Sequence, residues 1–359
     1  MMRLFALALA LCLGLSLPAS GRAEPAPAAA ITRAAIDAVI RPGYARFRAA
    51  AETLENDVRA LCEAPGPAQM ETARAAFRDT ALAWASIEMV GFGPVRAQNR
   101  LERILFWPDR RGTGLKQVQA ILATEDDTAT DAATLAQKSV AVQGLGALEY
   151  VLFGTGAADL AGADAFRCRY GAAIGTNLAK IAARIAAAWA GDDGIAGQLA
   201  RPGPGNALFR DESEALGEVT DILIHGLEQL RAVRLNGFLG ETPDKDRPKR
   251  ALLWRAGLTI ATVKANLDGL RDLFDKAGFA DHLAEEDRWI AASIRFEFAQ
   301  ADDALSALPA RIADTLADPQ AREKLAYVRV VSSSLSQLIG EHLTAAYGLT
   351  AGFSSLDGD

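Results

Sequence analysis

Three carboxylates in the first half of the chain have neighbours that make chemistry plausible. Glu149 lies in the middle of an apolar run, Glu88 lies near the end of a predicted helix, and Asp109 lies in a predicted turn. A carboxylate among apolar neighbours is costly to bury unless something pairs with it. If the three side chains converge, their oxygens suit a hard cation such as calcium or magnesium, or ferric iron.

Pairing with arginine is the alternative, and we favour it because buried carboxylates most often have such partners. A polar pocket with both signs of charge would equally bind a small ligand or a peptide at a domain junction. Trp107 and Trp254 adjoin charged residues and are candidates for ligand contact. The candidate arginine partners are Arg100, Arg103, Arg110 and Arg255.

Two glycines, Gly144 and Gly146, precede Glu149 in a helix that we predict over 130–153. Glycine inside a helix costs roughly 1 kcal/mol relative to alanine, which suggests that another backbone or a ligand approaches closely there. Two interpretations stay open. A neighbouring helix packs on the glycines while Glu149 pairs with an arginine, or Glu149 lines a binding site.

All three histidines, His225, His282 and His342, lie in the second half of the chain. His225 follows an apolar stretch, where a lone histidine is more often a hydrogen-bonded core residue than a ligand. It is a weak metal-ligand candidate, and metal hydrolysis would need it to fold next to Glu149 and Glu88. The short basic cluster 247–250 is interpreted as a solvated turn. Motifs of serine hydrolases, phosphate-binding loops and haem attachment are absent from the sequence.

Helices are the elements expected to position these residues, because the chain is rich in Ala and Leu and shows helical periodicity. The fold class predicted is all-α, with two four-helix-bundle-like domains packed side by side. The domains are 31–190 and 211–359, with the Gly- and Pro-rich segment 191–210 as linker. Helices are predicted at about 31–61, 68–90, 114–123, 130–153, 164–190, 211–235, 246–276, 281–302, 305–316 and 319–347.

The first 23 residues have the pattern of a bacterial signal peptide, with cleavage expected before Glu24 and a flexible arm over 24–30. This predicts a periplasmic protein. The residues before Cys12 lack a lipoprotein cleavage box, and no later segment is apolar enough to span a membrane. The leader contains two of the 38 basic residues and none of the 45 acidic ones, so the mature net charge is −9. Nucleic acid is therefore not an expected partner.

The two cysteines that remain after cleavage, Cys62 and Cys168, are predicted to form a disulfide, as isolated pairs in an oxidising compartment usually do. The alternative is two separate buried thiols. They have no Cys-x-x-Cys spacing, which argues against a structural zinc site.

Several segments, in this order, resemble those of the imelysin family. Gly144 and Glu149 match its signature Gly-x-His-x-x-Glu, with Gly146 at the histidine position. The other similar segments are Ala83-Trp84 with Glu88, Gly91-Phe92-Gly93-Pro94, Phe106-Trp107-Pro108-Asp109, Trp254-Arg255-Ala256-Gly257-Leu258-Thr259 and the C-terminal Gly348–Asp359.

This resemblance implies two helical bundles, a periplasmic or outer-membrane location and a link to iron uptake. Some relatives bind a metal through the signature His and Glu, a role that Gly146 cannot fill. The family was first described as peptidases, but its signature differs from the His-Glu-x-x-His of zinc peptidases.

We therefore predict a periplasmic, non-enzymatic binding protein with a site near the domain junction. Its ligand would be a small molecule, a metal such as iron or calcium, or another envelope protein. A metallopeptidase and a protein-interaction module are the alternatives. The candidate site residues are Glu149, Gly144, Gly146, Glu88, Asp109, Trp107, Arg110, Trp254 and Arg255.

Overall fold

The computed structural model describes residues 27–162 and 165–349, and within these ranges every regular element is helical. The predicted all-α fold class is confirmed. The predicted signal peptide, residues 24–26 of the predicted arm and the tail 350–359 lie outside the described residues.

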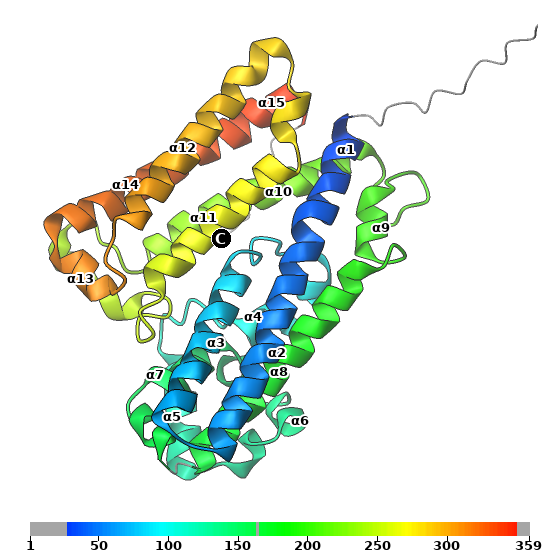
Figure 1. Ribbon diagram of the computed structural model, residues 1–359. Helices are drawn as coiled ribbons and strands as arrows, with labels where there is room; N and C mark the ends of the chain where they lie inside the picture. The colour runs from blue at the N-terminus through cyan, green and yellow to red at the C-terminus, as the bar shows by residue number, and fades with distance from the viewer. Residues whose placement is uncertain (1–26, 163–164, 350–359) are drawn as a thin grey trace, which may run out of the picture.

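The N-terminal half is built on three long helices that lie side by side (Figure 1). Helix α1 (Pro27–Ala34) continues through a π-helical turn (Ala35–Ile40) into α2 (Arg41–Glu63), which packs on α3 (Pro67–Ala85) and α8 (Ala165–Ala190). Pro67 starts α3, where its missing N–H costs nothing.

The predicted disulfide is confirmed, since Cys62 near the end of α2 is bonded to Cys168 on α8. Short helices make up the chain between α3 and α8. Their bounds are Gly93–Val95, Ala97–Asn99, Asp127–Ala129, Val140–Val142 and Ala157–Ala161 for 3₁₀ turns, and α4 (Arg100–Ile104), α5 (Thr113–Thr124), α6 (Ala132–Leu135) and α7 (Leu145–Phe153).

The C-terminal half consists mainly of four antiparallel helices, α10, α11, α12 and α14, drawn from green to orange-red in Figure 1. Their bounds, with those of the shorter elements, are α9 (Ile195–Ala200), α10 (Glu212–Gln229), a π-helical turn (Leu230–Leu235), α11 (Thr259–Lys276), α12 (Arg288–Ser306), α13 (Ile312–Ala317), α14 (Pro319–Gln337), a π-helical turn (Leu338–Leu343), α15 (Thr344–Ala346), and 3₁₀ turns at Pro243–Lys245, Pro248–Arg250, Phe279–His282 and Glu285–Asp287.

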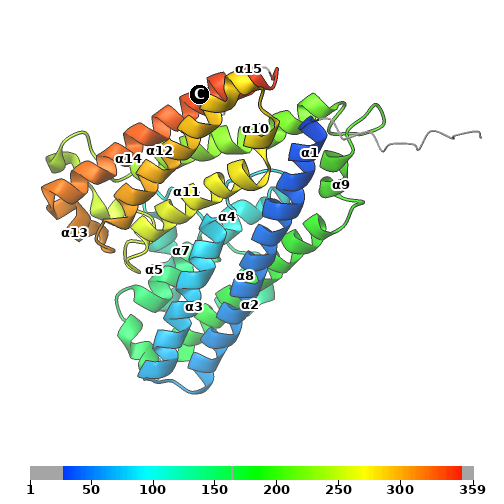
Figure 2. The same cartoon turned by 45° about the horizontal axis from the view of Figure 1, so that its top comes forward.

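The two halves share a packed interface, visible in both Figures 1 and 2. Helix α1 extends beyond the N-terminal half and packs along α10, while α11 packs on the end of α3. Gly269 makes the second contact possible, because a Cβ there would lie 2.2 Å from the carbonyl oxygen of Ser86. None of the helices formed by the described residues is both long and apolar enough to cross a bilayer.

Several predicted element boundaries were wrong. The helix predicted over 130–153 is interrupted, because Asp131 and Ser139 cap two short helices and Gly144 is extended before α7 begins. The helix predicted over 246–276 begins only at Thr259, after Leu253 and Gly257 take positive φ angles. Residues 27–30, predicted as part of a flexible arm, form the first turn of α1. The predicted linker 191–210 contains α9, which packs on α1 and α8.

Candidate functional site

Helix α7 carries the central carboxylate, and its start is fixed by a close backbone contact. A Cβ on Gly144 would lie 2.4 Å from the carbonyl oxygen of Ile104, so only glycine fits this approach. The expectation that Gly144 lies inside a helix is therefore wrong, whereas the expected close approach of another backbone is present. From Leu145 to Leu152 every α7 residue is buried except Gly146.

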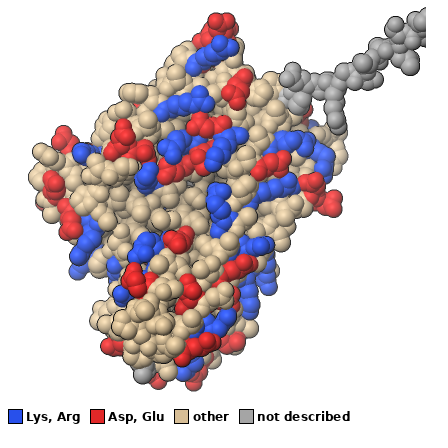
Figure 3. Space-filling model, in the orientation of Figure 1, with Lys and Arg blue, Asp and Glu red and all other residues tan. Residues whose placement is uncertain are grey.

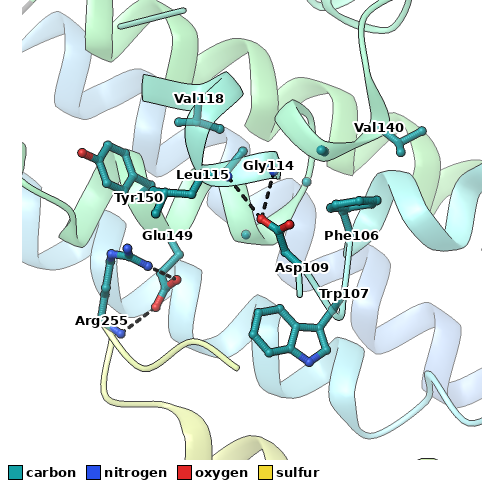
Figure 4. A pocket seen from close by; sticks show the side chains of 14 residues that line it. Phe106, Trp107, Asp109, Gly114, Leu115, Val118, Val140, Glu149, Tyr150 and Arg255 are labelled. Atoms are coloured by element: carbon teal, nitrogen blue, oxygen red, sulfur yellow. Dashed lines mark hydrogen bonds and ion pairs between the residues drawn. The ribbon is translucent and has the colours of Figure 1, made fainter. Parts of the chain in front are cut away.

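Glu149 joins the two halves through backbone donors of the segment before α11. Its Oε1 accepts hydrogen bonds from the backbone N–H groups of Arg255, at 2.8 Å, and Ala256, at 3.1 Å. The Arg255 guanidinium lies 3.8 Å from the other carboxylate oxygen (Figure 4). The pairing that we favoured for Glu149 is therefore present, together with two backbone bonds that we had not foreseen.

Burial raises the pKa of the Glu149 carboxyl above its usual value. The backbone N–H of Ala256 and the charge of Arg255 oppose this shift, since both favour the ionised form. The carboxyl is only 5% exposed, so desolvation outweighs them.

The Arg255 guanidinium also lies against two aromatic rings. Its Cζ is 4.4 Å from the Trp254 ring centroid and 5.4 Å from that of Tyr150. Such cation–π contacts fix the direction of a guanidinium while leaving its remaining N–H groups free to donate. The Tyr150 hydroxyl accepts a hydrogen bond from Gln119.

Asp109 caps α5, which explains its place in the turn before that helix. Its two carboxylate oxygens accept hydrogen bonds from the backbone N–H groups of Thr113, Gly114 and Leu115, at 2.7 to 3.3 Å. These N–H groups have no partners inside the helix, and a carboxylate here also complements the helix dipole. The turn that precedes it contains a cis Trp107–Pro108 bond.

Two cavities with shared lining residues lie beside Glu149. The inner pocket, of about 80 Å³, is the one drawn in Figure 4, and Gly144 lines it. The junction pocket, of about 530 Å³, lies between the turn around Trp107 and the segment 249–255 of the other half. Gly146 lines both, and a Cβ there would meet nothing within 4 Å. The other predicted residues that line the junction pocket are Glu149, Asp109, Trp107, Arg110, Trp254 and Arg255.

Glu88 belongs to a different cluster. Both of its oxygens accept from the buried Arg234 guanidinium, at 2.6 and 2.7 Å, and one also accepts from the Asn266 amide at 2.7 Å. The three-carboxylate cluster considered from the sequence does not form, because Glu88 is held by Arg234 and does not line the junction pocket. Among the described residues no group of three or more His, Cys, Asp or Glu is placed to hold a metal ion.

Comparison with known proteins supports the resemblance seen in the sequence. The imelysin family model matches residues 40–338. The chain belongs to the imelysin family. A curated relative, iron-regulated protein A of Synechococcus elongatus, is 23% identical over 316 residues, which cover 85% of this chain and 82% of the relative.

Solved structures show the same imelysin fold. An imelysin-like protein from Psychrobacter arcticum superposes with a TM-score of 0.76 at 22% identity, covering 92% of this chain and 99% of its own. A putative iron-regulated protein A precursor from Parabacteroides distasonis gives a TM-score of 0.72 at 14% identity, with coverages of 92% and 98%. The position that holds histidine in the imelysin signature is occupied by the exposed Gly146.

His225 lines a third cavity, of about 420 Å³, which we call the acidic pocket. It adjoins the junction pocket, since Trp107, Pro108 and Val233 line both. Burial raises the pKa of the Glu218 and Asp221 carboxyls, and the charge of His225 opposes both shifts. The acidic side chains that line it are Glu88, Glu218, Asp221 and Glu228.

Sequence reasoning missed several residues of these sites. Arg234 and Asn266 lie 146 and 178 positions from Glu88, so no local pattern links them to it. Lys249 and Arg250 are exposed, as predicted for a solvated turn, and also line the junction pocket. Their closeness in sequence to Trp254 and Arg255 is the signal that could have marked them.

Proposed function

We propose that this chain is a binding protein of the bacterial periplasm that acts in iron acquisition, and that the junction pocket holds its ligand. The observation that carries the proposal is the double role of Glu149. The same side chain ties the segment 254–256 to α7 and lines a cavity of about 530 Å³ between the halves. A ligand there would contact both halves at once.

The shape and lining of the junction pocket support a small ligand. Its volume lies within the roughly 300–1,000 Å³ range that is usual for ligand sites, and its walls combine two indole rings with charged groups. The open space at Gly146 contributes to the cavity, since any larger residue there would project into it.

The link to iron rests on a relative, and the periplasmic location on the sequence. The curated relative is named for its regulation by iron, and residues 1–23 have the pattern of a signal peptide. A metallopeptidase is less well supported, because His225 lines the acidic pocket with Glu88 while Glu149 lines the junction pocket.

Deletion of the gene and complementation under iron limitation test this function. We expect the deletion strain to grow more slowly and hold less iron, and the wild-type gene to restore both. Gly146→Phe should fail to restore them because the ring fills the pocket. Gly340→Phe is the matched control, since it adds the same ring to another helical glycine with open space around its Cβ. A deletion strain that grows normally and holds normal iron contradicts the proposal.

A further inference from the structure

Four basic side chains from both halves line the junction pocket. Arg110 comes from the turn before α5, whereas Lys249, Arg250 and Arg255 come from the segment before α11. Arg110, Lys249 and Arg250 are exposed, and none of them forms an ion pair with a described residue. Within the part of the chain that the structure describes, none of these three charges is therefore paired with a carboxylate.

The two carboxylates that line the same pocket do not offset these charges fully. Asp109 accepts three hydrogen bonds from the start of α5, and Glu149 accepts two from the segment 255–256. These donors partly neutralise both carboxylates. With four basic and two acidic side chains, the lining has two more positive than negative groups.

This positive lining contrasts with the chain as a whole, whose net charge is −7. On the face shown in Figure 3, acidic and basic side chains are interspersed over both halves. The two pockets instead differ in their balance of charge. The junction pocket has four basic side chains against two carboxylates, whereas the acidic pocket has four carboxylates against Arg96 and His225. A cationic group entering the junction would be drawn to the acidic pocket, and an anion to the junction pocket.

From this lining we infer that the ligand of the junction pocket is a small, multiply charged anion, held through carboxylate or phosphate groups by Arg110, Lys249, Arg250 and Arg255 from both halves. The inference rests on the function proposed above and names the ligand class of the same site.

Guanidinium groups suit such an anion because their planar fork donates two parallel hydrogen bonds to a carboxylate or a phosphate. Arg255 is held in place by Glu149 and by the rings of Trp254 and Tyr150, so its direction is fixed before a ligand arrives. The Lys249 ammonium group also lies over the Trp254 ring, with its Nζ 6.0 Å from the ring centroid. An anion between Arg110 and Arg250 would also reduce the repulsion between these two like charges.

In this scheme iron would reach the pocket as the cargo of an anionic chelate. Ferric iron in water is readily chelated by polycarboxylates, since hard cations prefer oxygen ligands. A chelate with net negative charge would meet the basic lining without needing a metal-ligand cluster from the protein. Ferric citrate is therefore one of the anions to be tested.

Isothermal titration calorimetry on the whole mature chain tests the inference, with citrate, ferric citrate and inorganic phosphate as anions and spermidine as the opposite charge. We expect at least one anion to bind, with an affinity that falls as salt rises. The double variant Arg110→Gln/Arg250→Gln should weaken binding about tenfold or more, because two charge-assisted contacts are lost. Comparison of the three anions shows whether carboxylate, phosphate or the ferric chelate is preferred.

A charge-matched control is Arg46→Gln/Arg288→Gln, two exposed arginines on α2 and α12, helices that contribute no residue to the pocket lining. It should change affinity less than about twofold, since distant exposed charges are screened.

The inference is overturned if no anion binds at about 10 mM, if both double variants weaken binding equally, or if spermidine binds and the Arg110→Gln/Arg250→Gln variant abolishes it. Anion binding in a protein whose deletion leaves growth and iron content unchanged would refute only the link to iron. Loss of complementation by Gly146→Phe without any anion binding would refute only the ligand class.

Discussion

Glu88 and Glu149 are both buried carboxylates that join the two halves, yet they are held by different kinds of partner. Glu88 is neutralised by the fully enclosed guanidinium of Arg234 and by the Asn266 amide. Glu149 is held mainly by two backbone N–H groups, and its basic neighbour Arg255 remains partly exposed to the junction pocket. In the Glu88 cluster the charges are paired with each other inside the protein. In the Glu149 cluster the positive charge of Arg255 stays accessible from the junction pocket.

This difference separates a structural contact from a candidate site. A buried ion pair contributes a fixed geometry, because separating the two charges would leave each of them buried without a partner. A carboxylate bound by backbone donors instead positions a loop, and here that loop carries Trp254 and Arg255 into the pocket. Substitutions at the two glutamates should therefore fail in different ways.

The largest expected effect is on the Glu88 cluster. Arg234→Met leaves the Glu88 carboxylate buried without its cation, and loss of one partner of such a pair typically costs about 3–5 kcal/mol. Urea denaturation followed by circular dichroism measures the free energy of unfolding. The double variant Glu88→Leu/Arg234→Met should recover much of the loss. A single variant that loses less than about 1 kcal/mol would remove the contrast between the two glutamates.

Glu149→Ala should have the next largest effect. It leaves the backbone N–H groups of Arg255 and Ala256 without their acceptor, at about 1–3 kcal/mol for a buried donor. Glu149→Gln keeps an acceptor oxygen at the same place and should lose much less. Hydrogen exchange at the Arg255 and Ala256 amides gives the local readout, which should quicken in the alanine variant alone. Equal exchange in both variants would show that the segment is held by other contacts.

The sequence could predict the parts of this site that lie in continuous segments. The helical fold class and the family segments follow from local composition and spacing, and the Cys62–Cys168 disulfide follows from the count of two cysteines after the predicted leader. Which carboxylate pairs with which arginine depends on tertiary packing. Arg234 was missed because its apolar surroundings resemble any buried helix face, and Asp109 was grouped with metal ligands because its capping role needs the start of α5 to be known.

The break in the helix before α7 also could not be predicted from the local sequence. Periodicity over 130–153 fits one helix, but the carbonyls of Arg103 and Ile104 approach Gly144 and leave no room for a side chain. The two glycines of the signature segment therefore have different roles. One admits a neighbouring backbone, and the other leaves a cavity open.

Alanine substitutions at Gly144 and Gly146 test the two roles, and we expect smaller changes in stability from them. Gly144→Ala should destabilise by about 1–3 kcal/mol, because the new Cβ would meet the Ile104 carbonyl and force a shift. Gly146→Ala should stabilise by up to about 1 kcal/mol, since alanine favours a helix and finds open space. Thermal unfolding of the two variants beside the wild type gives the comparison. Changes of the same sign at both positions would contradict the roles assigned to them.

The last prediction concerns how the free energy of unfolding depends on pH through the protonation of Glu149. Because burial raises its pKa in the folded protein, the folded state binds the proton more tightly than the unfolded state does. The carboxyl's contribution to stability should therefore fall as pH rises from the ordinary glutamate value to the raised one, and stay constant above it. Each unit of difference corresponds to about 1.4 kcal/mol. Glu149→Gln lacks this titration, so the wild type should lose stability relative to the variant across that window, as chemical denaturation at a series of pH values would show. The opposite result would be a wild type that gains stability relative to Glu149→Gln as pH rises. It would mean that Arg255 and the two backbone donors lower the pKa of Glu149 more than burial raises it. The Glu149 cluster would then be an ion pair of the same kind as the Glu88 cluster.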